Sequence, residues 1–416
     1  MDILFYTSKP QDIQSYGMRT HVTELLANLH KLGHSIQFVD GELYSPDQPI
    51  GPVPGRKNGS SKSLLKWATG LASSSPLKSE AWLLWNFLKE TRVFLYALRT
   101  VLRHRPEIIY WRESHFNSDC LISRLFGIPL VKEVNTLGGD ELKISMRTDK
   151  ATLWLYKIIQ ARTLDKADRI IVVTPEIKDL LQAEYRLNPD KVTVIQNGAN
   201  TELFRPMDKT EAKERLGLDR NASYICFVGL MREWQGIEYL IKSLPLIKDR
   251  HPEARLLIVG DGPLSKELQV IAGEAGVLSS VIFTGAVPYR EVPYYINASD
   301  VCAAPFITGL NKKGALCSLK MHEYMACGKP CVISRLDGIE DLVKNHCVVA
   351  VEPENITELA GGITSLLDSS ELRKQFGENG RKYIAENQSW EKVSARVAEV
   401  LRDVNRQNKK ILKEYA

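Results

Sequence analysis

Short apolar runs of strand length alternate with longer helical patterns along nearly the whole sequence, and this alternation constrains the fold more than any other feature. Between the runs lie segments such as Arg19 to Leu32, where Val22, Leu25 and Leu29 repeat at helical spacing. Strand, helix and strand in unbroken succession predict parallel sheets covered by helices on both faces. The runs that we interpret as strands are 3–7, 35–39, 108–111, 130–134, 169–173, 192–195, 224–229, 255–259, 281–284, 301–304, 331–334 and 348–351.

The strand series restarts near residue 222, after a polar stretch (197–221) that contains Pro206 and several charges. A chain of 416 residues is long enough for two domains. We therefore predict an α/β protein with two Rossmann-like, doubly wound parallel-sheet domains of about six strands each. Ligands bind such sheets beyond the carboxyl ends of the strands, and two such domains that face each other would leave a cleft between them.

Composition narrows the class of protein. Apolar residues make up 44% and charged residues 25% of the chain, which excludes a mainly disordered, collagen-like or coiled-coil protein. The seven cysteines include no C-x-x-C pair. The apolar run near the N-terminus is shorter than a signal peptide requires. No stretch has the length of uncharged apolar residues that a membrane-spanning helix requires. These features favour a cytoplasmic protein, either free or bound to the inner face of the cell membrane.

Positive charge is concentrated in residues 51–112, which hold 11 basic and 3 acidic residues. Such a segment attracts phosphates, anionic lipid or nucleic acid without choosing among them. Residues 56–85 add three tryptophans to five basic side chains, so they either dock on an anionic membrane or form a solvated loop and a helix that packs on its own domain. Aromatic residues do not interleave with the basic ones as base-stacking platforms would, so we expect no nucleic-acid partner.

Two glycine-containing loops follow strand-like runs. Gly17 stands close to the start of a helix after the first run, and Gly229 and Gly236 flank Arg232 after the run at 224–229. Glycine lets the backbone approach an anion, and a helix N-terminus favours negative charge. The second loop is able to hold a diphosphate, or its glycines only turn the chain while Arg232 meets a local carboxylate. The G-x-G-x-x-G pattern of dinucleotide binding is missing.

The segment SLKMHEYMACGKPCVIS predicts a helix over 319–327 that leads into a strand. Ser318 suits the N-cap, Gly328 suits the position after the last turn, and Pro330 prevents continuation. Lys320 and Glu323 share a face of this helix. Either the Glu323 carboxylate is buried and accepts hydrogen bonds from hydroxyls or a cation, or it forms a surface ion pair with Lys320.

These strings together resemble family 4 of the retaining, nucleotide-sugar-dependent glycosyltransferases. The resemblance is carried by SLKMHEYMACGKP, by VTVIQNGANTELFRP at 192–206, by ADRIIVVT at 167–174, by IVGDGP at 258–263 and by SWEKV at 389–393. The resemblance extends from Ile3 to about Leu401. It identifies the family but says little about which sugar is transferred.

The resemblance implies a GT-B fold: an acceptor-binding domain (1–200) to which a C-terminal helix (about 395–416) crosses back, and a donor-binding domain (201–394). The co-substrate would be a nucleotide-diphosphate sugar, the acceptor a glycan or a lipid-linked glycan, and neither a metal nor another cofactor would be needed. The residues that it implies are, for catalysis, Arg232, Lys320 and Arg112; for donor binding, Gly17, Gly229, Gly262, Ser318, Leu319 and Glu323; and on the acceptor side, Arg19, His115 and Asn135.

The sequence departs from the family pattern at three places. Ala315 replaces the first glutamate of the E-x7-E motif, Leu230 and Gln235 stand where the family has an arginine and a lysine, and Arg112 stands near the position of a histidine. Arg232 and Lys320 would have to supply the missing cations. These departures leave open a non-catalytic protein of the same fold that binds polysaccharide or lipid, and a nucleotide-sugar 2-epimerase.

Overall fold

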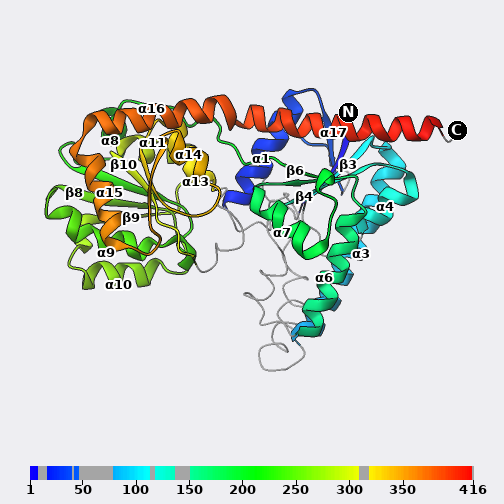
Figure 1. Ribbon diagram of the computed structural model, residues 1–416, viewed down its shortest axis with the longest axis horizontal. Coiled ribbons are helices and arrows are strands. Elements are labelled where there is room, and N and C mark those ends of the chain that lie inside the picture. The colour runs from blue at the N-terminus through cyan, green and yellow to red at the C-terminus, as the bar shows by residue number, and fades with distance from the viewer. Residues whose placement is uncertain are drawn as a thin grey trace. The chain divides into compact units, whose positions relative to one another are not determined.

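A computed structural model describes residues 1–7, 16–39, 42–45, 78–112, 118–135, 150–308 and 318–414 of the chain. These residues form two compact units, which Figure 1 shows as ribbons. The first unit consists mainly of residues 1–195 together with the last helix from residue 394, and the second mainly of residues 196–393. Each unit holds one six-stranded sheet. The predicted α/β class with two doubly wound parallel sheets is therefore confirmed.

The first sheet has the order β2-β1-β3-β4-β5-β6, and every neighbouring pair is parallel. The first strand of the chain thus lies inside the sheet, and the chain builds outward from it in both directions. Its elements are β1 (Asp2–Tyr6), α1 (Tyr16–Lys31), β2 (Ser35–Phe38), α3 (Lys78–His104), β3 (Ile108–Arg112), α4 (Ser118–Phe126), β4 (Leu130–Val134), α6 (Lys150–Asp165), β5 (Arg169–Val172), α7 (Pro175–Tyr185) and β6 (Val192–Val194).

The second sheet repeats this plan with the order β12-β11-β10-β7-β8-β9, again with parallel neighbours. Its strands are β7 (Ser223–Val228), β8 (Ala254–Val259), β9 (Val281–Gly285), β10 (Val301–Ala304), β11 (Cys331–Ser334) and β12 (Val348–Val351). Its helices are α8 (Lys209–Arg215), α9 (Ile237–Lys248), α10 (Ser265–Glu274), α11 (Val292–Ala298), α13 (Leu319–Ala326), α14 (Glu340–Lys344), α15 (Ile356–Asp368) and α16 (Ser370–Asn387).

Side-chain alternation along β7 explains why helices cover both faces of this sheet. Tyr224 and Cys226 belong to one fully buried apolar cluster, and Ile225 and Phe227 belong to another. A strand that is buried on both faces reads as a continuous apolar run, which is how the sequence signalled a parallel sheet. The chain order reverses between β10 and β7, so the carboxyl end of β7 is the switch point at which such sheets bind ligands.

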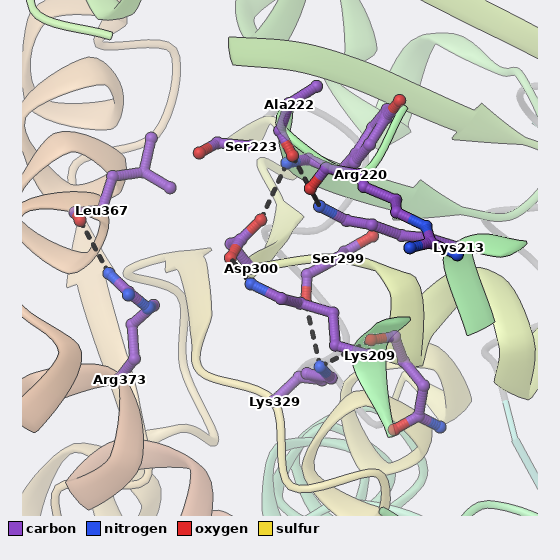
Figure 2. Close-up of polar contacts among 12 residues, drawn as sticks. Lys209, Lys213, Arg220, Ala222, Ser223, Ser299, Asp300, Lys329, Leu367 and Arg373 are labelled. Atoms are coloured by element: carbon purple, nitrogen blue, oxygen red, sulfur yellow. Dashed lines mark hydrogen bonds and ion pairs between the residues drawn. The ribbon is translucent and has the colours of Figure 1, made fainter. Parts of the chain in front are cut away.

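The amino ends of these strands are held together by basic side chains (Figure 2). The Lys209 ammonium lies 2.7 Å from an Asp300 carboxylate oxygen, and the other oxygen accepts a hydrogen bond from the Tyr224 backbone N–H at 3.0 Å. Lys213 and Lys329 donate to backbone carbonyls that include those of Ala222, at 2.6 Å, and Ser299, at 3.0 Å. Burial lowers the pKa of both lysines. These cations therefore serve the fold at the end of the sheet opposite to the switch point.

The last helix, α17 (Trp390–Glu414), begins in the second unit and belongs to the first from residue 394. Within the first unit, Asn405 and Lys409 both bind the Glu107 carboxylate, at 3.4 and 2.6 Å. Asn408 donates to the Gly127 carbonyl oxygen at 3.1 Å. Glu107 and Gly127 precede β3 and β4, so α17 joins the amino-terminal ends of these strands.

Candidate functional site

Two glycines bring the loops after β7 and β8 into close contact at the switch point. Gly229 has φ 145° and Gly260 has φ 135°, a backbone conformation that other residues rarely adopt. A Cβ atom on Gly260 would lie 2.1 Å from the Gly229 carbonyl oxygen, and one on Gly229 would lie 2.7 Å from the Lys320 Nζ. Glycine is therefore required here because backbone and a buried ammonium occupy the space of a side chain.

The same edge includes two further glycines. Gly236, with φ 64°, stands between the short 3₁₀ turn Glu233–Gln235 and the start of α9. A Cβ atom there would lie 1.8 Å from the Pro305 carbonyl oxygen, just beyond β10. A Cβ atom on Gly262 would lie 2.5 Å from the Met231 carbonyl oxygen. The carboxyl ends of β7, β8 and β10 and the N-terminus of α9 thus meet at one place.

Helix α13 adds a second N-terminus to this edge. It covers Leu319–Ala326, and Gly328 follows with φ 68°, as the sequence predicted. Ser318 occupies the N-cap position, but its side chain makes no capping hydrogen bond. The prediction that Ser318 is the N-cap residue is confirmed, but the hydrogen bond that a capping side chain usually accepts from the first turn is absent. Backbone N–H groups in a first turn without a side-chain cap are able to bind an anion.

Lys320 is a buried cation between two aromatic rings. Its Nζ lies 3.9 Å from the ring centre of Phe227 and 5.3 Å from that of Phe306, and it donates to the Gln235 side-chain oxygen at 2.5 Å. Burial lowers the pKa of the Lys320 ammonium to about 7, although the charge of Glu323 opposes this change. A buried amine with a pKa near neutrality is typical of a site that handles charge.

Glu323 is buried beside Lys320 on α13, with 6% of its surface exposed. The alternative of a surface ion pair between Lys320 and Glu323 is therefore wrong. The next residue, Tyr324, accepts a hydrogen bond from the Val228 backbone N–H at 2.7 Å. This bond fixes α13 to the carboxyl end of β7 and thereby sets the height of Lys320 and Glu323 above the sheet.

Arg232 stands on the loop between Gly229 and the 3₁₀ turn. Its guanidinium lies 5.2 Å from the ring centre of Trp234 and is partly exposed. Among the described residues no carboxylate lies within ion-pair distance of it. An arginine that stacks on an indole keeps its donors available for an anion.

The structure therefore brings seven predicted residues to one edge of the second sheet. They are Gly229, Arg232, Gly262, Ser318, Leu319, Lys320 and Glu323. Two helix N-termini, glycine-rich backbone and two cations at one edge suit a ligand with several negative charges, such as a diphosphate. Phe227, Phe306 and Tyr324 are not among the predicted site residues, because aromatic residues in apolar segments are usually part of the hydrophobic core.

The first unit holds a separate polar cluster around a buried carboxylate, Glu133. Its Oε1 atom accepts hydrogen bonds from Arg112 Nε at 2.9 Å and Asn135 Nδ2 at 2.8 Å, and lies 2.9 Å from His21 Nε2. Its second oxygen accepts the Tyr110 hydroxyl. Burial opposes ionisation of Glu133, but the charges of His21 and Arg112 outweigh it and hold the pKa of this carboxyl well below its usual range.

This cluster contains two of the predicted residues, Arg112 and Asn135, at the carboxyl ends of β3 and β4. Gly17 and Arg19 are exposed in the first turn of α1, and neither belongs to the described part of the cluster. His115 lies outside the described residues. Neither Glu133 nor His21 is among the predicted site residues, although a charged residue inside the strand LVKEV was a usable signal, since parallel strands are otherwise apolar.

In the described part of the chain, no group of three or more His, Cys, Asp or Glu side chains is arranged to hold a metal ion. Across the same residues, no helix combines the length and the apolar character needed to cross a membrane.

Comparison with known proteins gives two matches to family models that lie side by side. The model described as Glycosyltransferase Family 4 matches residues 16–203, and the one described as Glycosyl transferases group 1 matches residues 208–383. An uncharacterized glycosyltransferase of Methanocaldococcus jannaschii is 28% identical over 59% of this chain. The match spans 60% of that relative's own length.

Two further proteins are similar over most of the chain. The D-inositol 3-phosphate glycosyltransferase of Corynebacterium glutamicum is 27% identical, over 71% of each chain. The crystal structure of HepE from Anabaena in complex with UDP has a TM-score of 0.69 and 17% identity, and the match covers 97% of this chain and all of that one. At this identity the structural likeness shows a shared fold.

Proposed function

Because this chain belongs to the family 4-type glycosyltransferases with a GT-B fold, we propose that it moves a sugar from a nucleoside-diphosphate sugar to a glycan or lipid-linked acceptor. The observation that carries this proposal is the buried Lys320 ammonium at the switch point, between two helix N-termini and beside Gly229. A fixed cation at the carboxyl edge of β7 suits the diphosphate of the donor.

The proposed reaction retains the configuration of the sugar. The bond between the anomeric carbon and the diphosphate oxygen breaks, and its electron pair remains on the diphosphate. The acceptor hydroxyl oxygen bonds to the same face of the anomeric carbon, and its proton passes to the departing diphosphate oxygen. Negative charge therefore grows on the diphosphate in the transition state, where Lys320 and Arg232 stabilise it and no metal ion is needed.

Glu323 is proposed to bind the ribose of the donor. A buried carboxylate is able to accept hydrogen bonds from two neighbouring hydroxyls, and such charge-assisted bonds are stronger than neutral ones. The first unit is proposed to hold the acceptor next to the partly exposed Asn135, which the buried Glu133 and Arg112 hold in position. The Anabaena protein of this fold was solved in complex with UDP, which supports a nucleotide as a ligand of this chain.

The two alternative functions, a nucleotide-sugar 2-epimerase and a non-catalytic binding protein, have less support. A nucleotide-sugar 2-epimerase needs an acidic and a basic group beside the sugar. At the described edge of the second sheet the buried carboxylate is Glu323, and we have assigned Glu323 to the ribose. A non-catalytic protein would have little use for a buried cation whose pKa is about 7, because such a group costs stability without a charged ligand.

A panel of nucleotides tests the proposal. The melting temperature of the full chain is measured with UDP, GDP and ADP and with their sugar conjugates, because a ligand that binds only the folded state raises it. One nucleotide series should stabilise the protein, and Lys320→Met should abolish this stabilisation. Proton NMR of the product then gives the configuration of the new bond, and addition of EDTA tests metal independence. If no nucleoside diphosphate stabilises the protein, the proposal is wrong.

A further inference from the structure

Helices α3 and α4 expose an unusual number of large apolar side chains. Of the fifteen that are exposed in the described part of the chain, six lie on these two helices: Leu95, Tyr96, Leu102, Leu121, Leu125 and Phe126. Leu102 and Leu125 are 63% and 65% exposed. Single exposed apolar residues are ordinary, but a contiguous group of them marks an interaction surface.

Arginines occupy the same side of α3. Arg92, Arg99 and Arg103 are exposed and follow one another at intervals of seven and four residues, which places them on one helix face. Leu95 and Leu102 border this row at helical spacing, and Ala97 and Val101, on the opposite side, are buried in the core. The outward face of α3 is therefore both basic and apolar.

Helix α4 continues this face. Both helices run from the carboxyl end of one strand to the amino end of the next, so they lie parallel in one layer, and the Ser118 hydroxyl at the start of α4 donates to the Glu90 carboxylate on α3 at 2.6 Å. On α4, Arg124 is exposed between Leu121 and Leu125.

Among the described side chains of α3 and α4, no exposed carboxylate offsets the arginines on this face. Residues 91–105 contain no acidic residue, and Asp119, the acidic residue of 118–127, is fully buried against Lys132. A contact with a second copy of the chain through a twofold axis would set the arginines against themselves. An anionic lipid surface is complementary to both the charge and the apolar side chains.

We propose that the outward face of α3 and α4, the α3/α4 face, docks the protein on an anionic membrane. The arginines contact lipid phosphates and the leucines enter the interface between headgroups and acyl chains. This inference rests on the proposed function only for its purpose, which is to bring the first unit to a lipid-linked acceptor. The predicted membrane segment at 56–85 lies mostly outside the described residues, and the α3/α4 face does not depend on it.

The test is co-sedimentation of the full chain with vesicles of phosphatidylcholine alone or mixed equally with phosphatidylglycerol, at low and high salt. The wild type should bind the mixed vesicles, and salt should weaken the binding. Arg99→Glu with Arg103→Glu should weaken it by about two orders of magnitude. Leu102→Ser with Leu125→Ser should weaken it about tenfold and leave a salt-sensitive remainder.

Matched controls carry the same changes elsewhere. Lys31→Glu with Lys382→Glu removes the same charge, and Leu246→Ser with Leu278→Ser removes the same apolar groups from other exposed sites. Both controls should bind as the wild type does. Equal binding to both vesicle types, or equal losses in variants and controls, would overturn the proposal. So would a dimer in analytical ultracentrifugation that the Leu102 and Leu125 variant dissociates, since the occupant would then be a second copy.

Donor binding separates this inference from the proposed function. Calorimetry with the nucleoside diphosphate should give the same affinity for the wild type and for all four double variants. Vesicle binding without nucleotide binding would leave the α3/α4 face standing and overturn the glycosyl-transfer proposal. Nucleotide binding without vesicle binding would overturn the membrane-docking proposal and leave the glycosyl-transfer proposal intact.

Discussion

Lys320 should make the proposed binding of a diphosphate depend on pH. Burial lowers the pKa of its ammonium to about 7, so the group is mostly neutral above that pH in the unliganded protein. A diphosphate binds the protonated form, and the protein must therefore take up a proton when it binds above pH 7. We expect nucleoside-diphosphate affinity to fall by up to about tenfold per pH unit above pH 7.

Isothermal titration calorimetry checks this expectation in buffers of different ionisation enthalpy. Proton uptake should be seen on the alkaline side of pH 7 and should vanish in Lys320→Met, which keeps the apolar contact with Phe227 and Phe306. A wild-type affinity that does not change between acidic and alkaline buffers would rule out Lys320 as a ligand of the diphosphate.

Arg232 should act on turnover more than on binding. Its guanidinium stacks on Trp234, and in the proposed reaction it meets the charge that grows as the leaving diphosphate departs. Arg232→Ala should therefore lower kcat by about 10²-fold or more, while the donor Kd changes less. Arg290→Ala, on the same unit, is a control that should leave both unchanged. Full turnover in Arg232→Ala would remove this residue from the mechanism.

Glu323→Gln should weaken donor binding by about 1.5–3 kcal/mol, because the amide keeps the shape of the side chain but loses charge-assisted acceptance from two hydroxyls. Calorimetry measures the loss, and the exposed Glu274→Gln on α10 is the control. An unchanged affinity would reject the ribose role of Glu323. A melting temperature close to that of the wild type would show that the fold is intact.

At the scale of elements, the site depends on the close contact of the loops after β7 and β8, which meet through the backbone of glycine residues. Gly260→Ala puts a Cβ atom 2.1 Å from the Gly229 carbonyl oxygen and forces an L residue to φ 135°, so the loops after β7 and β8 must separate. We expect a loss of stability of about 1–3 kcal/mol and a loss of nucleotide binding.

The matched control for this change is Gly273→Ala in helix α10. No heavy atom lies within 4 Å of the Cβ position there, and the backbone is helical. Alanine should stabilise the helix by about 0.5–1 kcal/mol and leave nucleotide binding unchanged. Chemical denaturation measures both variants. If Gly260→Ala behaved as Gly273→Ala does, the close packing of the two loops would not be needed for the site.

At the scale of the whole molecule, the main part of the second unit, residues 196–393, is a continuous stretch of chain with its own core. Both apolar clusters around its sheet draw their residues from 199–384. We expect residues 196–393 to fold alone, with a cooperative thermal transition, and to bind the nucleoside diphosphate. A fragment that does not melt cooperatively, or that folds without binding nucleotide, would show that the donor site needs the rest of the chain.

The first unit is not continuous in sequence. Val397, Leu401 and Val404 on α17 are buried, and α17 binds Glu107 and Gly127. A fragment of residues 1–195 lacks these contacts and should be less stable than the same fragment with residues 394–416 supplied as a peptide. Urea denaturation with and without the peptide measures the difference.

The sequence by itself determined the fold class, because apolar runs of strand length, helical spacing and cap residues are local properties of the chain. It also indicated Lys320, Glu323, Arg232 and the glycines, since charged residues and glycines in apolar surroundings are conspicuous. Only the tertiary structure decided that Lys320 is buried between aromatic rings with a pKa of about 7, and not paired with Glu323 at the surface.

The cluster around Glu133 and the α3/α4 face were likewise decided by tertiary structure. Asn135 is a sequence neighbour of Glu133, but His21 on α1 and Arg112 on β3 are distant in sequence, and no local spacing predicts that they meet Glu133. The sequence does not distinguish the exposed leucines of α3 and α4 from buried ones, because an apolar residue at helical spacing is usually buried. Whether a helix face is covered depends on which elements pack against it, and this is fixed only when the whole chain has folded.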